Sequence, residues 1–456
     1  MLNSPGGVMK PSKFNIISKS KESPNKILLY NTLHDHRVLF DDPEMNPHII
    51  FEKLNQKQNL TEKESDVVSQ MHEMGLVLED HVDEQTLFDA WYVEKIRERT
   101  DVLQVTILPT MNCNLACDYC FENDVRENGI MKPEMISKTI DWLTSRLNSV
   151  RPQQFHLTFF GGEPLLHPKA IREISKSLWS VCESLNIDMG FGMVTNGVLL
   201  TSELVDELLP YGFQWMKITF DGDREAHDKK RIKHNREGTF DIIYNNLCAI
   251  AGKLKLSIGG NFDNDNYASM FNLVERIRNS PFASDVTMAR FKPIMKINSE
   301  VISGREGKVT SFCEVCSFNE PQINGILSLQ NKVRESGLPI QKRPEIGPCE
   351  YHTRHSMTIG PDGSLYKCPA FVGISNLAAG HVSEAQYNQQ GEQQLAMPKW
   401  DEDCESCAYL PNCCGGCRMN SVNKTGCLEK KSCEGNFLSR SIEDFMQEEI
   451  KRLSAE

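Results

Sequence analysis

Cys113-Asn114-Leu115-Ala116-Cys117-Asp118-Tyr119-Cys120 is the most informative stretch of this sequence. It places three cysteines in a CxxxCxxC spacing directly after an apolar run, Val102 to Leu108. Three thiolates that close together on one loop can hold three irons of a [4Fe–4S] cluster, and the fourth iron then has no protein ligand. With 16 cysteines in 456 residues, about 0.02 chance matches to this spacing are expected, so the loop favours a cluster over unrelated buried thiols or part of a zinc site.

The composition narrows the setting in which these cysteines act. The length predicts two to four domains, and the formal charge of −12 disfavours a nucleic-acid role that depends on phosphate attraction. No run of 18 apolar residues predicts a membrane span, and residues 1–13 lack the apolar region of a secretory signal. Disulfides are therefore a poor explanation for the cysteines, and ligation of metal or clusters in a reducing cytoplasm fits better.

Strand and helix patterns alternate from about residue 100, which predicts an α/β fold with a parallel sheet and crossover helices. The clearest helix is Pro133–Leu147, with Pro133 at its first position. Six units are too few for a closed eight-stranded barrel, so we expect an open partial (β/α)6 barrel with its active site at the carboxyl ends of the strands. The predicted strands are Val102–Leu108, Phe155–Phe160, Asp188–Val194, Gln214–Phe220, Lys255–Gly260 and Val286–Phe291.

Outside this barrel the patterns predict four further segments. Residues 1–98 form a unit of short strands and helices, in which Thr61 and Glu64 have the spacing of a capping box. Residues 99–300 are the barrel, and 301–348 are a bridging segment with little periodicity. Residues 349–436 are rich in cysteines and turns, so metal ligation should supply much of their stability. Residues 437–456 form a closing helix.

A second motif, Gly161-Gly162-Glu163-Pro164, follows the next predicted strand. Two glycines let the backbone approach a ligand closely, and Glu163 offers an anion to an ammonium group. Taken alone, Gly-Gly is a common turn. Its place one strand after the cysteine loop makes it a candidate part of the same site.

Later strands also end in polar residues. Thr195-Asn196-Gly197 ends one strand, and Thr219-Phe220-Asp221-Gly222 ends the next. Arg231 follows within a charged run, in which Lys229, Lys230 and Lys233 are interpreted as solvated surface residues. A guanidinium such as that of Arg231 suits bidentate binding of a carboxylate.

These motifs together resemble radical S-adenosylmethionine (SAM) enzymes, over roughly residues 100–435. The resemblance implies that the open iron binds the amine and carboxylate of SAM, and that one-electron reduction yields a 5′-deoxyadenosyl radical, which abstracts a substrate hydrogen. It implies that Tyr119 lies near the adenine and that Gly161, Gly162 and Glu163 contact the methionine amine. Thr219 and Arg231 would hold the carboxylate, although the family more often has Ser at the first position. Asn196 is assigned to the same pocket.

The cysteines near the C-terminus resemble the seven-cysteine SPASM pattern, which holds two auxiliary [4Fe–4S] clusters and would bring the total to three. The resemblance implies that Cys349, Cys368 and Cys417 bind the first auxiliary cluster. It implies that the second is bound by Cys404, Cys407, Cys413 and Cys433. Without the resemblance, such a segment would be interpreted first as a zinc ribbon.

The chain departs from the sulfatase-maturing members of the family at two positions. They have an eighth cysteine where this chain has His355, so the fourth iron of the first auxiliary cluster has His355, Cys427, Cys313 or no protein group as its ligand. An open iron there could bind a substrate thiolate. They also have an Asp, a candidate proton acceptor, where Pro369 stands here. No catalytic residue is therefore predicted. Cys313 and Cys316 have ligand spacing without an assigned role.

The first hundred residues extend the prediction to a substrate. Peptide-maturing relatives often carry an N-terminal winged-helix-like module that binds a precursor's leader as an added strand, whereas sulfatase-maturing enzymes begin close to the cysteine loop. The chain is therefore predicted to be a radical SAM/SPASM peptide maturase that forms a thioether or another cross-link, with a leader-bearing precursor peptide and a donor such as flavodoxin or ferredoxin as partners. The alternatives are a formylglycine-generating sulfatase maturase and a non-catalytic iron–sulfur carrier or scaffold.

Overall fold

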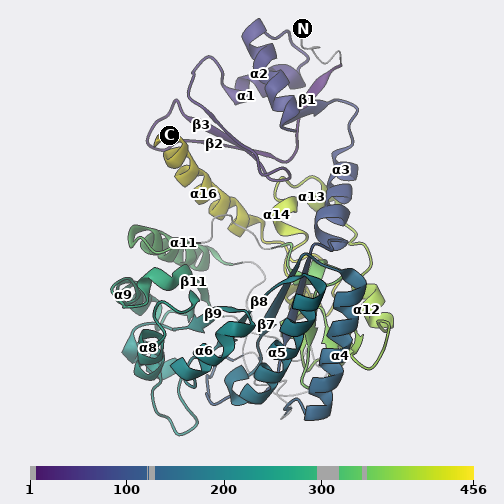
Figure 1. Ribbon diagram of the computed structural model, residues 1–456. Helices are drawn as coiled ribbons and strands as arrows, with labels where there is room; N and C mark the ends of the chain where they lie inside the picture. The colour runs from purple at the N-terminus through teal and green to yellow at the C-terminus, as the bar shows by residue number, and fades with distance from the viewer. Residues whose placement is uncertain (1–6, 121, 123–128, 295–317, 341–346, 456) are drawn as a thin grey trace.

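The computed structural model describes residues 7–120, 122, 129–294, 318–340 and 347–455 (Figure 1). Cys313 and Cys316, to which the sequence assigned ligand spacing, lie outside the described residues. Among the described helices, none is both long and apolar enough to cross a membrane.

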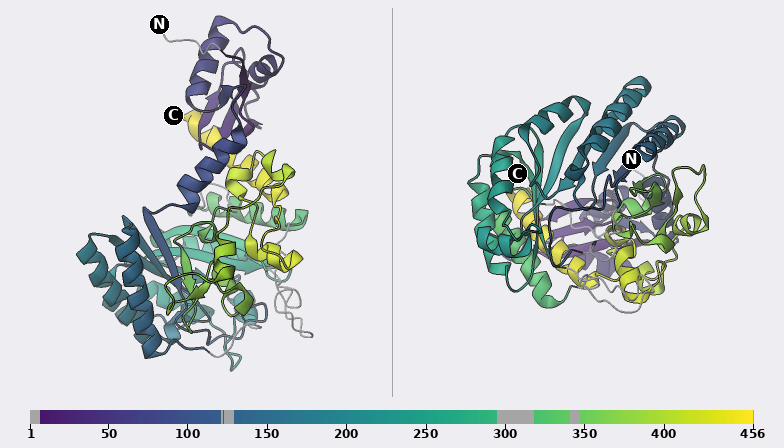
Figure 2. Two further views of the ribbon diagram at one scale, coloured as in Figure 1. Left: turned by 90° about the vertical axis from the view of Figure 1, so that its right-hand side faces the viewer. Right: turned by 90° about the horizontal axis from the view of Figure 1, so that it is seen from below.

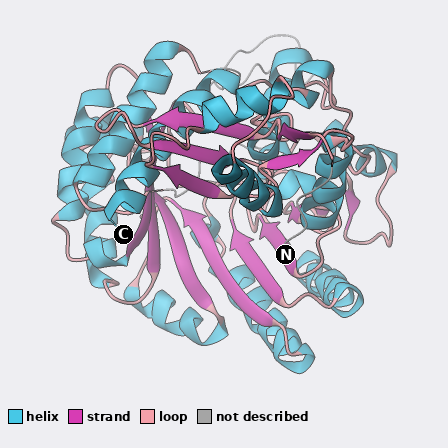
Figure 3. Ribbon diagram, turned by 90° about the horizontal axis from the view of Figure 1, so that it is seen from above, coloured by secondary structure: helices cyan, strands magenta, loops and turns pink. Residues whose placement is uncertain are grey.

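Six parallel strands, neighbours in chain order, make up the central part of the main sheet. Helices connect successive strands and lie together on one face, which is visible from below and from above (Figures 2 and 3). This confirms the predicted α/β fold and all six predicted strands. The strands are β6 (Val102–Ile107), β7 (Gln154–Phe159), β8 (Asp188–Thr195), β9 (Phe213–Thr219), β10 (Lys255–Phe262) and β11 (Val286–Pro293).

The crossover helices bury one apolar face each against this sheet. Helix α4 runs over Pro133–Val150, beginning at Pro133 as predicted, and buries Ile136, Leu143 and Leu147. These side chains join alternate strand residues such as Leu157 in one continuous core. The other crossover helices are α5 (Pro168–Leu185), α6 (Ser202–Leu208), α7 (Arg224–Lys230), α8 (Phe240–Ala249) and α9 (Tyr267–Arg278).

The cysteine-rich segment extends this sheet, which sequence reasoning did not anticipate. Strand β12 (Met357–Ile359) pairs in parallel with β6, and β13 (Ser364–Tyr366) and β14 (Gly380–His381) continue the sheet in antiparallel fashion. Strands of two or three residues carry no alternation that a sequence pattern can reveal. The pairing fixes the start of the cysteine-rich segment directly beside the strand that leads to the cysteine loop.

The N-terminal residues form a three-stranded antiparallel sheet with two helices and a further strand pair. The sheet has the order β2 (Asn15–Lys19), β3 (Ile27–Asn31) and β4 (Arg37–Phe40). The predicted capping box is confirmed, since Thr61 and Glu64 exchange side-chain and backbone hydrogen bonds. The remaining elements are α1 (Pro47–Asn55), α2 (Glu62–Glu73), β1 (Met9–Pro11) and β5 (Val77–Glu79), with β1 antiparallel to β5.

The closing helix joins the two ends of the chain. Helix α16 (Gly435–Ala455) lies against β2 and β3 (Figure 1), where Ile442 and Met446 pack on Leu28 and Tyr30. One face of the N-terminal sheet is thus covered by the last element of the chain. The other helices are α3 (Glu84–Trp91), a π-helical turn (Tyr92–Arg97), α11 (Glu320–Glu335), α12 (Gln389–Gln394), α13 (Glu402–Glu405), α14 (Leu410–Cys413) and α15 (Arg418–Thr425).

Helix α11 shows where the sequence was uninformative, because it lies in the segment that was expected to be a bridge without periodicity. It begins at a capping box formed by Asn319 and Gln322 and packs Ile323 and Leu329 into the main core. The division of the chain into five segments stays a prediction.

Replacing Phe191 by Ala is expected to lower the free energy of unfolding by about 3–5 kcal/mol. Phe191 is fully buried, stacks on Phe213 with ring centres 4.9 Å apart, and meets Phe159 edge-on at 5.7 Å. Urea unfolding followed by tryptophan fluorescence measures the loss. The exposed Leu199, replaced by Ala, is the control and should change the free energy by less than about 0.5 kcal/mol. Equal losses in both variants would contradict the assigned core.

Candidate active site at the strand ends

The cysteine loop leaves the end of β6 and is held by a segment far along the chain. The Ala116 N–H donates to the Ile232 carbonyl at 2.8 Å, and Leu115 forms a β-bridge with Lys233. His234 hydrogen-bonds to the Cys113 carbonyl at 3.1 Å. The protein's own backbone contacts thus position the start of the cysteine loop.

The glycines of the Gly-Gly-Glu-Pro loop let two loops touch. A side chain at Gly161 or Gly162 would collide with the carbonyl oxygens of Thr110, Met111 and Asn112, just before Cys113. The backbone of Gly161 is in the left-handed region, with φ at +120°. The glycines therefore let this loop approach the backbone that leads into the cysteine loop, and their contact with a ligand stays a prediction.

The Glu163 carboxylate is fully buried and accepts three hydrogen bonds. Thr195 donates to it at 2.7 Å, the Asn196 N–H at 2.8 Å and the Leu165 N–H at 2.9 Å. Burial raises the pKa of Glu163, and these donors oppose the rise. The carboxylate therefore ties the loop after β7 to the end of β8, and its contact with an amine stays a prediction.

Asn196 carries this connection on to the cysteine loop. Its side-chain amide donates to the Asn114 side-chain oxygen at 2.7 Å and lies 3.9 Å from the Cys113 sulfur. Glu163, Asn196 and Cys113 thus form one contiguous chain of polar contacts. The structure brings together these three predicted site residues, which come from the ends of three neighbouring strands.

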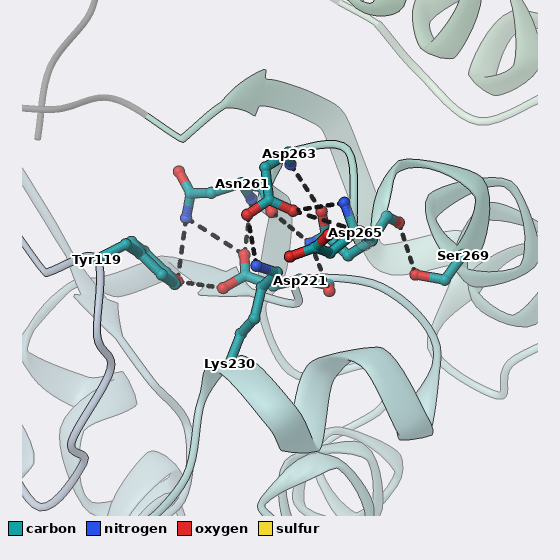
Figure 4. Close-up of polar contacts among 8 residues, drawn as sticks. Tyr119, Asp221, Lys230, Asn261, Asp263, Asp265 and Ser269 are labelled. Carbon is teal, nitrogen blue, oxygen red and sulfur yellow. Dashed lines mark hydrogen bonds and ion pairs between the residues drawn. The ribbon is translucent and has the colours of Figure 1, made fainter. Parts of the chain in front are cut away.

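Tyr119 lies in a second polar cluster, at the ends of β9 and β10 (Figure 4). Its hydroxyl hydrogen-bonds to the Asp221 carboxylate, accepts from Arg231 at 2.7 Å and from the Asn261 amide at 3.4 Å. Burial raises the pKa of Tyr119 well above its ordinary value, so the hydroxyl keeps its proton. The Asn261 N–H donates to the other Asp221 oxygen at 2.7 Å.

One N–H of the Arg231 side chain makes no hydrogen bond to the described residues. Its guanidinium lies 3.6 Å from the fully buried Asp221 carboxylate, yet its Nε is buried and has no hydrogen-bond partner among the described residues. A buried N–H without an acceptor is costly, so this atom fits an anionic ligand that the protein itself does not supply. Thr219 is half-buried at the end of β9, and within the described part of the chain no hydrogen bond joins its side chain to Arg231.

A buried histidine fixes the positions of Asp221 and Arg231. The Asp221 N–H donates to His227 Nδ1 at 3.2 Å, so the ring carries its proton on Nε2 and donates to the Thr239 hydroxyl at 3.0 Å. That hydroxyl donates to the Arg231 carbonyl at 2.6 Å. Burial, and then the nearby Arg231 charge, hold the pKa of His227 well below its usual range. The neutral ring is required for this chain of donors.

Within each of the two cysteine groups that the resemblance implies, the thiols influence one another electrostatically, and their roles as cluster ligands stay a prediction. Burial raises the pKa of Cys368, and the next largest contributions come from Cys349 and Cys417. Burial is likewise the main reason why the pKa of Cys349 rises to about 11, and Cys417 adds to it. These three thiols therefore lie within electrostatic reach of one another.

The second group shows the same behaviour. Burial raises the pKa of Cys413 to about 11, with Cys407 and Cys433 adding to the rise. Burial also raises the pKa of Cys404 to about 12, with Cys413 among the smaller contributions. None of the cysteines that the structure describes forms a disulfide.

Two of the candidates for a fourth ligand of the first group, His355 and Cys427, lie within the described residues. His355 is 3.3 Å from an Arg146 nitrogen, beside Tyr387. Cys427 lines a cavity of about 560 Å³ together with Arg418. The fourth ligand stays an open prediction. Sequence reasoning did not consider His352, whose Nδ1 is 2.9 Å from the Tyr92 hydroxyl and whose buried Nε2 has no partner among the described residues.

The part of the chain that the structure describes holds no group of three or more His, Cys, Asp or Glu side chains spaced to bind one metal ion. Cysteines that hold a [4Fe–4S] cube bind separate irons, so they need not meet that spacing. Sequence reasoning also missed the roles of Asp221, His227 and Asn261. Their only signal was position, since Asp221 follows β9 and Asn261 lies near the end of β10.

Comparison with known proteins agrees with this site. A family model described as the radical SAM superfamily matches residues 107–266. A cysteine-type anaerobic sulfatase-maturating enzyme of Clostridium novyi is 22% identical over 77% of this chain and 96% of its own length. A structure of anSMEcpe with bound AdoMet and Cp18Cys peptide has a TM-score of 0.55 at 18% identity, covering 78% of this chain and 98% of that one. Streptococcus suis SuiB bound to S-adenosylmethionine has a TM-score of 0.50 at 17% identity, covering 93% and 99%.

The fold and the site define a radical SAM domain, built on a parallel sheet with the cysteine loop at its strand ends. The chain is an enzyme with a radical SAM domain over residues 107–266, and SAM and a [4Fe–4S] cluster are the cofactors of this domain. The predicted enzyme class is therefore confirmed, and the alternative of a non-catalytic carrier or scaffold is set aside. The residues assigned to SAM and to the clusters stay predictions.

The low pKa of His227 predicts a pH dependence of stability. In the unfolded chain the ring has its ordinary pKa of 6.5 and binds a proton below that pH, which the folded state does not. The free energy of unfolding should therefore fall as the pH falls below about 6.5, by up to about 1.4 kcal/mol per pH unit from this residue. Urea unfolding at pH values between about 5 and 8 measures the slope.

The variant His227→Asn removes the titrating ring and should show a smaller loss at low pH than the wild type. The control is His48→Asn, at an exposed position on α1, which should keep the wild-type slope. A wild-type slope in His227→Asn would show that the ring is not held neutral.

Proposed function

We propose that this protein is a radical SAM peptide maturase that binds a precursor peptide through its N-terminal unit and cross-links it. When bound, the cluster and SAM supply the radical that abstracts a hydrogen from the peptide. The observation that carries the proposal is an open sheet edge in the N-terminal unit, which suits the addition of a peptide strand. The likeness to SuiB, which spans 93% of this chain, supports the presence of that unit.

The open edge belongs to β4. The Asn31 N–H donates to the His36 carbonyl, so these two residues form a hydrogen-bonded pair at the turn between β3 and β4. Hydrogen-bonded pairs alternate along an antiparallel ladder, so the backbone groups of Val38 and Phe40 also face β3. The backbone groups of Arg37 and Leu39 then point away from β3. On the opposite edge, Gln447 of α16 donates to the Lys19 carbonyl at the end of β2 and accepts from the Lys21 N–H just beyond it. The arrangement supports β4 as the docking edge.

The residues of the site would each hold part of the cofactors. Cys113, Cys117 and Cys120 would bind three irons of the radical SAM cluster, on the loop that Asn196 and Glu163 position. The spare N–H of Arg231 would donate to the SAM carboxylate, a role shared with Thr219. Cys349, Cys368 and Cys417 would hold one auxiliary cluster, and Cys404, Cys407, Cys413 and Cys433 another, for the electron that leaves the substrate.

A second candidate is a sulfatase maturase, which would oxidise a cysteine of its target by removing two hydrogens. The similarity to the Clostridium novyi enzyme over 96% of that enzyme favours it. The peptide in the anSMEcpe structure supports a peptide substrate in either case. The two candidates differ in their need for the N-terminal unit, because the anSMEcpe likeness covers only 78% of this chain.

Changing Cys113, Cys117 or Cys120 to Ala should abolish the formation of 5′-deoxyadenosine from SAM under a chemical reductant, because each would lose one cluster ligand. Chromatography of the nucleoside products and the iron content of anaerobically reconstituted protein measure the effect. The control is Cys248→Ala, on α8 and outside all predicted clusters, which should match the wild type. Retained cleavage of SAM in Cys117→Ala would sink the cluster assignment.

The variant Leu39→Pro should lose cross-linking of the precursor while it keeps the reductant-driven cleavage of SAM. Proline at an edge position removes one outward N–H and leaves the ladder to β3 intact. The matched control Leu39→Ala removes the same side chain, keeps the N–H and should retain cross-linking. Mass spectrometry after co-expression with short neighbouring open reading frames gives the readout.

A cysteine-type sulfatase peptide is the second substrate in this experiment. If the wild type removes two hydrogens from its cysteine, and Leu39→Pro does so equally well, the sulfatase maturase replaces the peptide maturase as the function.

A further inference from the structure

Three cations share the face of the main sheet that its helices leave open. On β9, Met216 and Ile218 pack into the helix-covered core, so Lys217 between them points to the opposite face. On β11, Ala289 and Phe291 face the helices, and Arg290 and Lys292 alternate with them. We call this side the inner face.

The register brings these cations to one place. Gly259 of β10 is paired with Thr219 on one side and with Arg290 on the other. Strands two places apart are separated by about 10 Å, a span that Lys and Arg side chains can bridge from both sides. Gly259 has no side chain to fill the space between, and a Cβ atom there would lie 3.1 Å from the Lys217 Cε.

Two of these three cations, Lys217 and Arg290, have no acidic partner among the described residues that would neutralise their charge. Within the part of the chain that is described, no acidic side chain forms an ion pair with Lys217 or Arg290. Their surfaces are exposed, yet the surrounding barrel desolvates them. Burial and then repulsion by Lys292 and Arg290 lower the pKa of Lys217 to about 8. In a chain with a net charge of −12, two neighbouring cations without an acidic partner among the described residues, Lys217 and Arg290, favour an anionic ligand.

We propose that Lys217, Arg290 and Lys292 bind a carboxylate of the peptide substrate. The proposal rests on the proposed function, because it names the chemistry of the residue that the maturase would grip. The carboxylate belongs either to an Asp or Glu side chain or to the C-terminus of the peptide. Arg290 supplies a planar pair of donors, and each lysine supplies a point charge.

SAM itself is a poor occupant of this place. It carries a sulfonium and an ammonium beside its one carboxylate, so its net charge is positive, and three further cations would repel it. The spare Arg231 donor lies in the separate cluster with Tyr119 and Asp221. A peptide with an acidic residue has the opposite charge balance.

The site would fix the register of the substrate. Arg290 lies level with Thr219 across Gly259, beside the strand end assigned to SAM. Lys292 is close enough to Cys417 to oppose, with weaker effect, the rise in pKa that burial and other groups produce in that thiol. An anchored carboxylate would therefore hold the neighbouring residue between the SAM region and the first auxiliary cysteine group.

The test is affinity selection with mass spectrometry on the full-length, anaerobically reconstituted enzyme with SAM. The probe is a pool of short amidated peptides of neutral residues in which one position is Glu or Gln. The wild type should enrich Glu members over their Gln counterparts by about tenfold or more. Lys217→Gln and Arg290→Gln should each lose that preference, and Arg290→Lys should retain part of it.

A second pool of the Gln peptides, with a free C-terminus in place of the amide, separates the two sources of the carboxylate. Preference for the free acid over the amide assigns the site to the C-terminus, and preference for Glu assigns it to a side chain. The matched control is Lys176→Gln, on the outer surface of α5, which should keep the wild-type preference. Iron content and SAM cleavage confirm that each variant is folded and loaded.

Two results would overturn the inference. One is a wild type that cleaves SAM and binds peptides with no preference for a carboxylate, which leaves the proposed function intact. The other is an Arg290→Gln variant with weakened SAM affinity in the absence of peptide, which would assign the cations to the carboxylate of SAM. A wild type that cleaves SAM but binds no peptide from either pool would count against the peptide maturase itself, and the inference would fall with it.

Discussion

The buried carboxylate of Glu163 is the constraint on which the arrangement of the site depends. A charge removed from water is tolerated only where donors replace its hydration, and here Thr195, Asn196 and Leu165 supply them. Two of these donors belong to the end of β8, so the loop after β7 cannot move without breaking them. The Asn196 side chain in turn donates a hydrogen bond to Asn114, in the loop that carries Cys113. Three successive strand ends are thereby fixed by one side chain.

The second polar cluster likewise surrounds a buried carboxylate with partners, here including the positive charge of Arg231. Asp221 is fully buried and interacts with Tyr119 and Arg231, and a neutral histidine holds its backbone. The two clusters meet at the cysteine loop, because the segment that follows Arg231 pairs with Leu115 and Ala116. The loop is thus held from both sides by residues that need not touch a metal. These contacts preorganise the loop that would bind the cluster.

The sequence was most informative where a pattern of residue types indicates a single structure or a single kind of ligand. Apolar patterns marked all six barrel strands, and the resemblance grouped the C-terminal cysteines into sets whose thiols influence one another electrostatically. It was uninformative where contacts join distant positions. No pattern shows that β12 will pair with β6, or that Gly162 will meet Asn112. Glu163 illustrates the limit, since its motif placed it at the site while only the fold shows which donors surround it.

The pairing of β12 with β6 also explains how the cysteine-rich segment and the inner face act as one electrostatic unit. It places the segment after Cys349 on the strand that leads to Cys113, so the first auxiliary cysteine group lies against the barrel. Clusters bound by thiolates are anionic, and their charge favours nearby cations. Lys292 lies within the electrostatic reach of Cys417, whereas Lys217 has no acid in an ion pair among the described residues. The positive inner face therefore differs along its length, because Lys292 lies near the cysteine group while Lys217 has no acidic ion-pair partner among the described residues, and this difference supports the proposed binding of an anion near the strand ends that hold Tyr119 and Thr219.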